Sequence, residues 1–185
     1  ALLDQLQSAR VVGVQMEHWQ EGGFTGGKLN GAIDLVATNS NGREALLDIK
    51  WGAFKYRRRS LTESSYLQLA TYAEMRRQAT GRWPALGYFV IEDARLLALD
   101  THYFPQAEVY APENGESVAE YWQRFQCTWR WRREQLDGGL IEAPITGTEP
   151  SDTLPRPPGE KGLPLPDHYD SFNDYAVLTG WKEDA

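Results

Sequence analysis

The sequence predicts an α/β fold, with a central mixed β-sheet of about four or five strands and helices on its faces. Three successive segments with strand character, residues 11–19, 28–38 and 44–51, come first. A helical pattern at 60–79, an apolar strand at 85–92 and a long amphipathic helix at 117–137 follow. The predicted order is therefore a βββαβ core with a long C-terminal helix.

Turn and capping signals set the limits of these elements. Residues 39–42 read Asn-Ser-Asn-Gly, a strong hairpin signal between the second and third strands. Ser60 and Glu63 have the spacing of a capping box, so the middle helix is expected to begin at Ser60. The glycine-rich residues 21–27 and the basic residues 52–59 are interpreted as connections, and a short strand is expected at 95–99.

The chain has 185 residues, a length that suits one domain with a sizeable core. We assign the core to residues 1–139 and interpret residues 140–185 as a Pro- and Gly-rich acidic tail that packs back on it. No apolar run is long enough to span a bilayer and no signal peptide is visible. The single cysteine, Cys127, excludes an internal disulfide and a thiolate metal cluster, and a cytoplasmic protein is expected on this basis.

The net charge of −7 argues at first against a nucleic-acid partner. Residues 140–185 contain three basic and nine acidic side chains, so most of the negative excess belongs to the tail. Residues 43–82, in contrast, contain nine basic and four acidic side chains. A basic surface is therefore expected around any site that this part of the chain forms.

Two carboxylates and an ammonium group are expected to converge on the sheet. Asp34 lies on the second predicted strand, and Asp48 and Lys50 lie two residues apart on the third. Residues i and i+2 of a strand share a face, so Asp48 and Lys50 project together while Ile49 faces the other way. Pairing of the two strands brings Asp34 beside them. Such a group suits a hard divalent cation and phosphoryl chemistry.

These residues together resemble the PD-(D/E)XK nuclease superfamily, and most closely the RecB-like exonuclease branch. The resemblance covers residues 11–92 and rests on Gly31-Ala32-Ile33-Asp34, on Asp48-Ile49-Lys50, and on a helix with Gln68 and Tyr72. Each motif alone is weak, and the ordered set is fairly specific. The resemblance implies a restriction-endonuclease-like sheet and a metal-dependent deoxyribonuclease that hydrolyses DNA phosphodiester bonds. It favours an exonuclease over an endonuclease.

The resemblance also implies roles for individual residues. Asp34 and Asp48 would ligate one or two Mg²⁺ or Mn²⁺ ions, and the main-chain carbonyl of Ile49 would add an oxygen ligand. Lys50 would position or activate the attacking water and stabilise charge in the transition state. These oxygen ligands favour hard ions over zinc.

Further residues are candidates on the same basis. Gln68 and Tyr72 lie one helical turn apart and would complete the catalytic group, with Gln68 near Lys50 or a phosphate. Glu17, on the first predicted strand, is the candidate for a further acidic metal ligand. His18 is the second choice, because neighbouring strand residues face opposite ways and only one can point inward.

The basic run after the third strand is interpreted as a DNA-binding surface. It comprises Lys55, Tyr56, Arg57, Arg58 and Arg59, to which Arg76 on the following helix is added. The cations would contact phosphates of single- or double-stranded DNA, and Tyr56 would stack on a base.

The resemblance suggests a module of a larger bacterial or phage protein, with a helicase or other domain as partner and a role in DNA repair or phage defence. Two other interpretations stay open. One is a catalytically silent nuclease-fold module that binds nucleic acid or a protein partner. The other is an aromatic-rich interaction module. Metal-dependent activity separates a nuclease from both, and salt-dependent DNA binding in EDTA separates the last two from each other.

Overall fold

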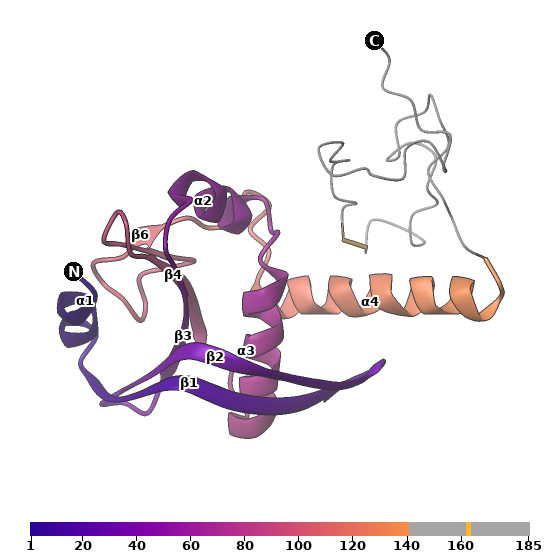
Figure 1. The fold of residues 1–185 in the computed structure, drawn as a ribbon, viewed down its shortest axis with the longest axis horizontal. Coiled ribbons are helices and arrows are strands. Elements are labelled where there is room, and N and C mark those ends of the chain that lie inside the picture. The colour runs from indigo at the N-terminus through magenta and orange to yellow at the C-terminus, as the bar shows by residue number, and fades with distance from the viewer. Residues whose placement is uncertain (141–161, 164–185) are drawn as a thin grey trace, which may run out of the picture. The chain divides into compact units, whose positions relative to one another are not determined.

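The computed structural model describes residues 1–140 and 162–163 of the chain. Its elements follow one another as α1 (Leu2–Ser8), β1 (Val11–Phe24), β2 (Gly27–Asn39), β3 (Glu44–Lys50), α2 (Phe54–Thr62), α3 (Leu67–Thr80), β4 (Ala85–Val90), β5 (Arg95–Ala98), β6 (Glu108–Val109) and α4 (Val118–Asp137) (Figure 1).

The strands form one six-stranded mixed sheet in the order β1-β2-β3-β4-β5-β6. β3 runs parallel to β4 and β5 runs parallel to β6, whereas the other neighbours are antiparallel. The predicted α/β class, with a mixed sheet flanked by helices, is confirmed. The sheet has one more strand than predicted, because β6 has two residues and is too short to leave a pattern in the sequence.

The glycine-rich segment belongs to the β1–β2 hairpin and is not the open connection that the sequence suggested. Phe24 pairs with Gly27, so the turn between the strands has two residues. A side chain at Gly22 would meet the Cγ atom of Met75 in α3 at 2.9 Å. Glycine is therefore needed there because α3 approaches the hairpin closely, which is a tertiary requirement and not a local turn signal. Figure 1 shows α3 crossing the hairpin.

The basic residues that follow β3 are helical, which corrects the predicted loop. Residues 54–59 form the first two thirds of α2, and α3 is a separate helix. Ser60 is not an N-cap, because its hydroxyl donates to the carbonyl of Ser65 at 2.9 Å. Glu63 pairs with Arg59 one turn earlier, at 2.7 Å, and so closes α2 instead of opening the next helix. Lysine and arginine are good helix formers, which explains why a charged run without apolar periodicity is nevertheless helical.

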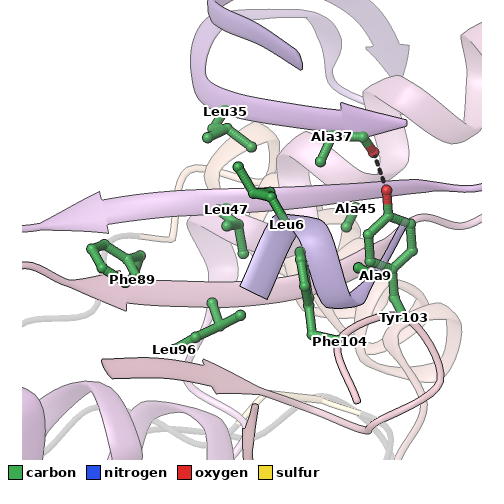
Figure 2. Close-up of a cluster of buried hydrophobic side chains, with 10 residues drawn as sticks. All are labelled: Leu6, Ala9, Leu35, Ala37, Ala45, Leu47, Phe89, Leu96, Tyr103 and Phe104. Atoms are coloured by element: carbon green, nitrogen blue, oxygen red, sulfur yellow. Dashed lines mark hydrogen bonds between the residues drawn. The ribbon is translucent and has the colours of Figure 1, made fainter. Parts of the chain in front are cut away.

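One face of the sheet carries a buried apolar cluster that α1 covers (Figure 2). Its members are Leu6, Ala9, Leu35, Ala37, Ala45, Leu47, Phe89, Leu96, Tyr103 and Phe104. The Tyr103 hydroxyl donates to the carbonyl of Ala37 at 2.7 Å, so its polar atom is satisfied inside the cluster. α1 was not predicted from the sequence, because a seven-residue helix depends on tertiary packing more than on its own pattern.

α4 begins where it was predicted, and the structure adds a capping box at its N-terminus that was not predicted. The amide and hydroxyl of Ser117 donate to the carboxylate of Glu120 at 2.8 and 2.6 Å, and the Glu120 amide donates back to the hydroxyl at 3.3 Å. None of the helices in the described part of the chain is both long and apolar enough to cross a membrane.

The chain divides into two units, Ala1–Trp122 and Gln123–Ala185, at a boundary inside α4. In the second unit, Gly162 and Leu163 hydrogen-bond to side chains of α4. Apart from Leu140 and these two residues, the predicted acidic tail 140–185 lies outside the described residues, and so does its expected packing on the core.

Gly87 is expected to be intolerant of substitution because it lies in the middle of the sheet. A Cβ atom at this position would meet the carbonyl oxygen of Leu97 at 2.6 Å and the side chain of Leu47 at 3.0 Å. We expect Gly87→Ala to lower the free energy of unfolding by about 1–3 kcal/mol, measured by urea denaturation. Gly13→Ala is the matched control, since its nearest contact would be an ordinary 3.9 Å. Equal stability of the two variants would contradict this packing.

Candidate metal and catalytic site

Asp34 lies on β2 at the point where the main-chain pairing of β2 with β3 ends. The last main-chain pair between these strands is Leu35 with Leu47. Beyond this pair, the Asp34 carboxylate accepts a hydrogen bond from the Ile49 amide at 2.7 Å. Continuing the register places Asp34 opposite Asp48. A carboxylate therefore occupies the space between the two strands, where the main-chain ladder has ended.

Asp48 is a carboxylate in an apolar strand and is only 1% exposed. The Nζ atom of Lys50 lies 2.9 Å from Oδ2 of Asp48. Neither Asp48 oxygen has a geometrically sound hydrogen bond among the residues that the structure describes, so Oδ2 meets Lys50 as an ion pair and Oδ1 is left without a partner. Burial raises the pKa of Asp48 above its ordinary value of 3.8, Lys50 opposes the rise, and the charge of Asp34 adds to it. A buried carboxylate oxygen without a partner is rare in proteins and points to a missing ligand.

The oxygen atoms at this point fit a hard cation. Asp34 and Asp48 supply carboxylates, and the Ile49 peptide group lies beside them because its amide donates to Asp34. Within residues 1–140 and 162–163, no three His, Cys, Asp or Glu side chains lie close enough together to hold a metal ion. Two carboxylates are sufficient for Mg²⁺, which usually keeps several water ligands. The residues present therefore fit Mg²⁺ or Mn²⁺ better than a metal that needs a full set of protein ligands.

Glu17 lies next to this pair in the sheet without joining it. The β1–β2 pairing on either side of Glu17 places it opposite Asp34. Its φ angle is 47°, in the left-handed region that side chains other than glycine rarely adopt. The Glu17 side chain is exposed and forms no three-residue cluster with Asp34 and Asp48. Strained residues of this kind concentrate at functional sites, which keeps Glu17 as a candidate ligand.

Gln68 and Tyr72 lie together on α3, as predicted. Nε2 of Gln68 donates to the Tyr72 hydroxyl at 3.3 Å. A Cβ atom on Gly31 would meet Cε1 of Tyr72 at 3.0 Å, so the tyrosine ring covers β2 three residues before Asp34. This contact gives the glycine of the Gly-x-x-Asp motif a physical reason. The Gln68 side chain is exposed, and it hydrogen-bonds to Tyr72.

Tyr88 also belongs to the candidate site, although no motif in the sequence points to it. It pairs with Asp48 in the parallel β3–β4 ladder, so the two side chains share a face. Burial is the main cause that raises the pKa of Tyr88; Asp48 also raises it, whereas a hydrogen bond with Ser60 and the charge of Arg57 lower it. The Tyr88 hydroxyl thus lies within electrostatic reach of both the acidic site and α2. No sequence signal shows this, because the register joins strands separated by two helices.

The predicted DNA-binding residues divide into exposed and half-buried groups on α2. The exposed ones are Lys55, Tyr56, Arg58 and Arg59. Arg57 is half-buried, and its guanidinium carbon lies 4.8 Å from the centre of the Tyr56 ring. The basic run is therefore a helical surface whose members face different directions.

Arg76 does not belong to this surface, which corrects its predicted role. Its Nε atom donates to Glu44 at 3.1 Å, and Nη1 lies 2.9 Å from Oε1 of Gln20 and 3.1 Å from Nε2 of His18. The side chain is only 12% exposed. Arg76 therefore ties α3 to β1 and β3. The same contact directs His18 toward Arg76, so the second-choice metal ligand is engaged elsewhere.

Two cavities lie at the other end of the β3–β4 pair. One has a volume of about 210 Å³ and is lined in part by Arg43, Glu44 and Trp83, and the other, of about 420 Å³, is lined in part by Pro84 and Ser117. Neither includes Asp34, Asp48 or Lys50 in its lining. The acidic site therefore lies toward the C-terminal end of β3, outside both cavities.

A comparison of the chain with models of protein families finds no match, and a comparison with curated proteins finds no significant relative.

Proposed function

We propose that the protein is a metal-dependent deoxyribonuclease that hydrolyses DNA phosphodiester bonds. The observation that carries this proposal is the buried Asp48 carboxylate, whose Oδ1 has no hydrogen-bond partner within the described part of the chain; Asp48 lies opposite Asp34, and its Oδ2 is 2.9 Å from Lys50. A purely structural carboxylate would be expected to have its oxygens satisfied. A carboxylate pair with an adjacent ammonium group is suited to hold a divalent ion beside a phosphate.

Each residue of the site would have a different role in the proposed reaction. A bound Mg²⁺ or Mn²⁺ ion supplies charge neutralisation at the phosphate and lowers the pKa of a water molecule. Asp34 and Asp48 would hold this ion, with the Ile49 carbonyl as a further oxygen donor and Glu17 as the proposed additional ligand. Lys50, whose side chain is 26% exposed, reaches both Asp48 and solvent. It would orient the attacking water and stabilise negative charge that develops on the phosphate.

DNA would approach along α2. Lys55 and Arg58 are exposed cations on this helix, and Tyr56 offers an exposed ring for stacking. Arg59 shares its charge with Glu63, so its contribution to phosphate binding is expected to be smaller. The resemblance favours an exonuclease that works with a helicase or another domain of a larger protein.

A second candidate function is a nuclease-fold module that binds without cleaving. The observation in its favour is the outer strand β1, where Val12, Met16 and Trp19 are exposed. An edge strand with exposed apolar side chains is a usual place for a protein partner. This function would not need the divalent ion, so metal dependence distinguishes the two.

The test is to incubate end-labelled linear DNA and closed circular DNA, each single- and double-stranded, with the protein in Mg²⁺, Mn²⁺ or EDTA. We expect cleavage in the presence of either metal and none in EDTA. Cleavage restricted to linear DNA would support an exonuclease. If DNA bound in EDTA with a salt-dependent affinity but stayed intact with both metals, the binding module would replace the nuclease as the better account.

A further inference from the structure

Arg57 is a half-buried cation without an anionic partner among the residues that the structure describes. Its Nε atom is buried and has no hydrogen-bond partner there. Other cations nearby are paired, since Lys50 contacts Asp48 and Arg59 contacts Glu63. A guanidinium group that is partly removed from water is unfavourable unless an anion compensates it. Arg57 is therefore suited to receive an anion from outside the described residues.

Two aromatic rings lie close to the Arg57 guanidinium group. Its central carbon lies 4.8 Å from the centre of the Tyr56 ring and 5.7 Å from that of Tyr88. Cation–π contacts of this kind hold an arginine without using its N–H groups, which stay available for a ligand. Arginine presents these groups as a fork that matches two oxygens of a phosphate.

Tyr88 connects Arg57 to the acidic site. Tyr88 is in register with Asp48 on the adjacent strand. The guanidinium carbon of Arg57 lies 5.7 Å from the centre of the Tyr88 ring, so the α2 face that carries Arg57 is directed at this strand. The exposed Arg58 follows on the same helix about 100° away. Of the basic side chains on α2, Arg57 is thus the one set against the row that contains Asp48 and Tyr88.

We infer that Arg57 binds the phosphate that is cleaved, whereas Lys55 and Arg58 bind phosphates elsewhere on the strand. This inference rests on the proposed nuclease function. In this role, Arg57 donates two N–H groups to non-bridging phosphate oxygens and stabilises their charge in the transition state. The substrate group that it recognises is a phosphodiester, and the base does not contribute.

The test compares steady-state cleavage of linear DNA by wild type, Arg57→Ala, Arg57→Lys and the control Arg58→Ala, with Mn²⁺ present. We expect Arg57→Ala to lower kcat by about 10²-fold or more. Arg57→Lys should stay nearly as low, because a lysine lacks the planar fork. Arg58→Ala should retain kcat, raise KM, and reduce the salt dependence of DNA binding by about one charge. Added guanidinium ions should restore part of the activity of Arg57→Ala and none of that of Lys50→Ala.

Two controls separate the ways in which this can fail. Thermal unfolding shows whether each Arg57 variant is folded at the assay temperature, and Arg57→Gln, which retains bulk beside Tyr56, substitutes if Arg57→Ala does not fold. Suppose that wild type cleaves DNA in a metal- and Lys50-dependent manner. If the folded Arg57 variants then keep the wild-type kcat, or behave like Arg58→Ala, the role assigned to Arg57 is wrong and the nuclease function stands. If wild type cleaves with neither metal, both are wrong.

Discussion

Lys50→Ala is expected to lower the rate of metal-dependent DNA cleavage by about 10²–10³-fold, the usual effect of removing one group that stabilises transition-state charge. Lys50 Nζ lies 2.9 Å from Asp48 and is the cation nearest to that carboxylate in the described contacts. The loss should appear in kcat and in kcat/KM alike, because the interaction strengthens as charge develops on the phosphate. Single-turnover cleavage at saturating Mn²⁺ measures this directly.

Lys55→Ala is the matched control for Lys50. Lys55 carries the same charge five residues later, is exposed, and lies on α2. Its removal should weaken DNA binding in a salt-dependent way and leave the single-turnover rate at saturating protein nearly unchanged. Equal losses in the two variants would mean that Lys50 contributes only to the general positive charge of the surface, and its assigned role would then be lost.

Asp48→Asn is expected to abolish cleavage and, in EDTA, to raise the stability of the folded protein. Burial raises the pKa of Asp48, so the folded state binds the proton more tightly than the unfolded chain. For such a group, stability is lost as the pH rises through the folded-state pKa. Asparagine removes this loss because it is neutral at every pH. A gain of about 1 kcal/mol would raise Tm by about 2–4 °C for a chain of this length.

The pH dependence of Tm distinguishes this effect from a general improvement in packing. The advantage of Asp48→Asn should be largest at neutral pH and should disappear below the ordinary carboxyl pKa of 3.8, where Asp48 is protonated in both states. Glu134→Gln, an exposed carboxylate on α4, should change Tm little at any pH. A variant Asp48→Asn that is less stable than wild type at pH 7 would show that the Asp48–Lys50 pair stabilises the fold more than burial of the charge destabilises it.

Local sequence signals were sufficient for much of the sheet. The Asn-Gly turn at 41–42 located the β2–β3 hairpin, where Gly42 has a φ of 69° and Asn39 accepts hydrogen bonds from the amides of Asn41 and Arg43. The alternation of β3 placed Asp48 and Lys50 on one face, and their contact at 2.9 Å confirms it. These features depend only on neighbours a few residues away.

What the sequence did not show depends on partners far along the chain. The sequence around Gly22 is typical of a loop, but in the structure Met75 packs against this glycine. Arg76 was predicted to contact DNA, but in the structure it pairs with Glu44. The half-buried Arg57 cannot be told from its neighbours in the basic run. Its distinction comes from Tyr88, which the parallel pairing of β4 brings beside Asp48. Register between distant strands is the information that a local pattern lacks.

The most direct measurement is a calorimetric titration of the protein with Mn²⁺, without DNA, for wild type, Asp34→Asn and Asp48→Asn. Glu134→Gln is the control for non-specific binding to exposed carboxylates. If Asp34 and Asp48 hold the ion, wild type and Glu134→Gln bind Mn²⁺ alike, and both aspartate variants lose that binding. Binding that is unchanged in Asp34→Asn and Asp48→Asn would contradict a metal site between β2 and β3, and with it the proposed basis of DNA cleavage.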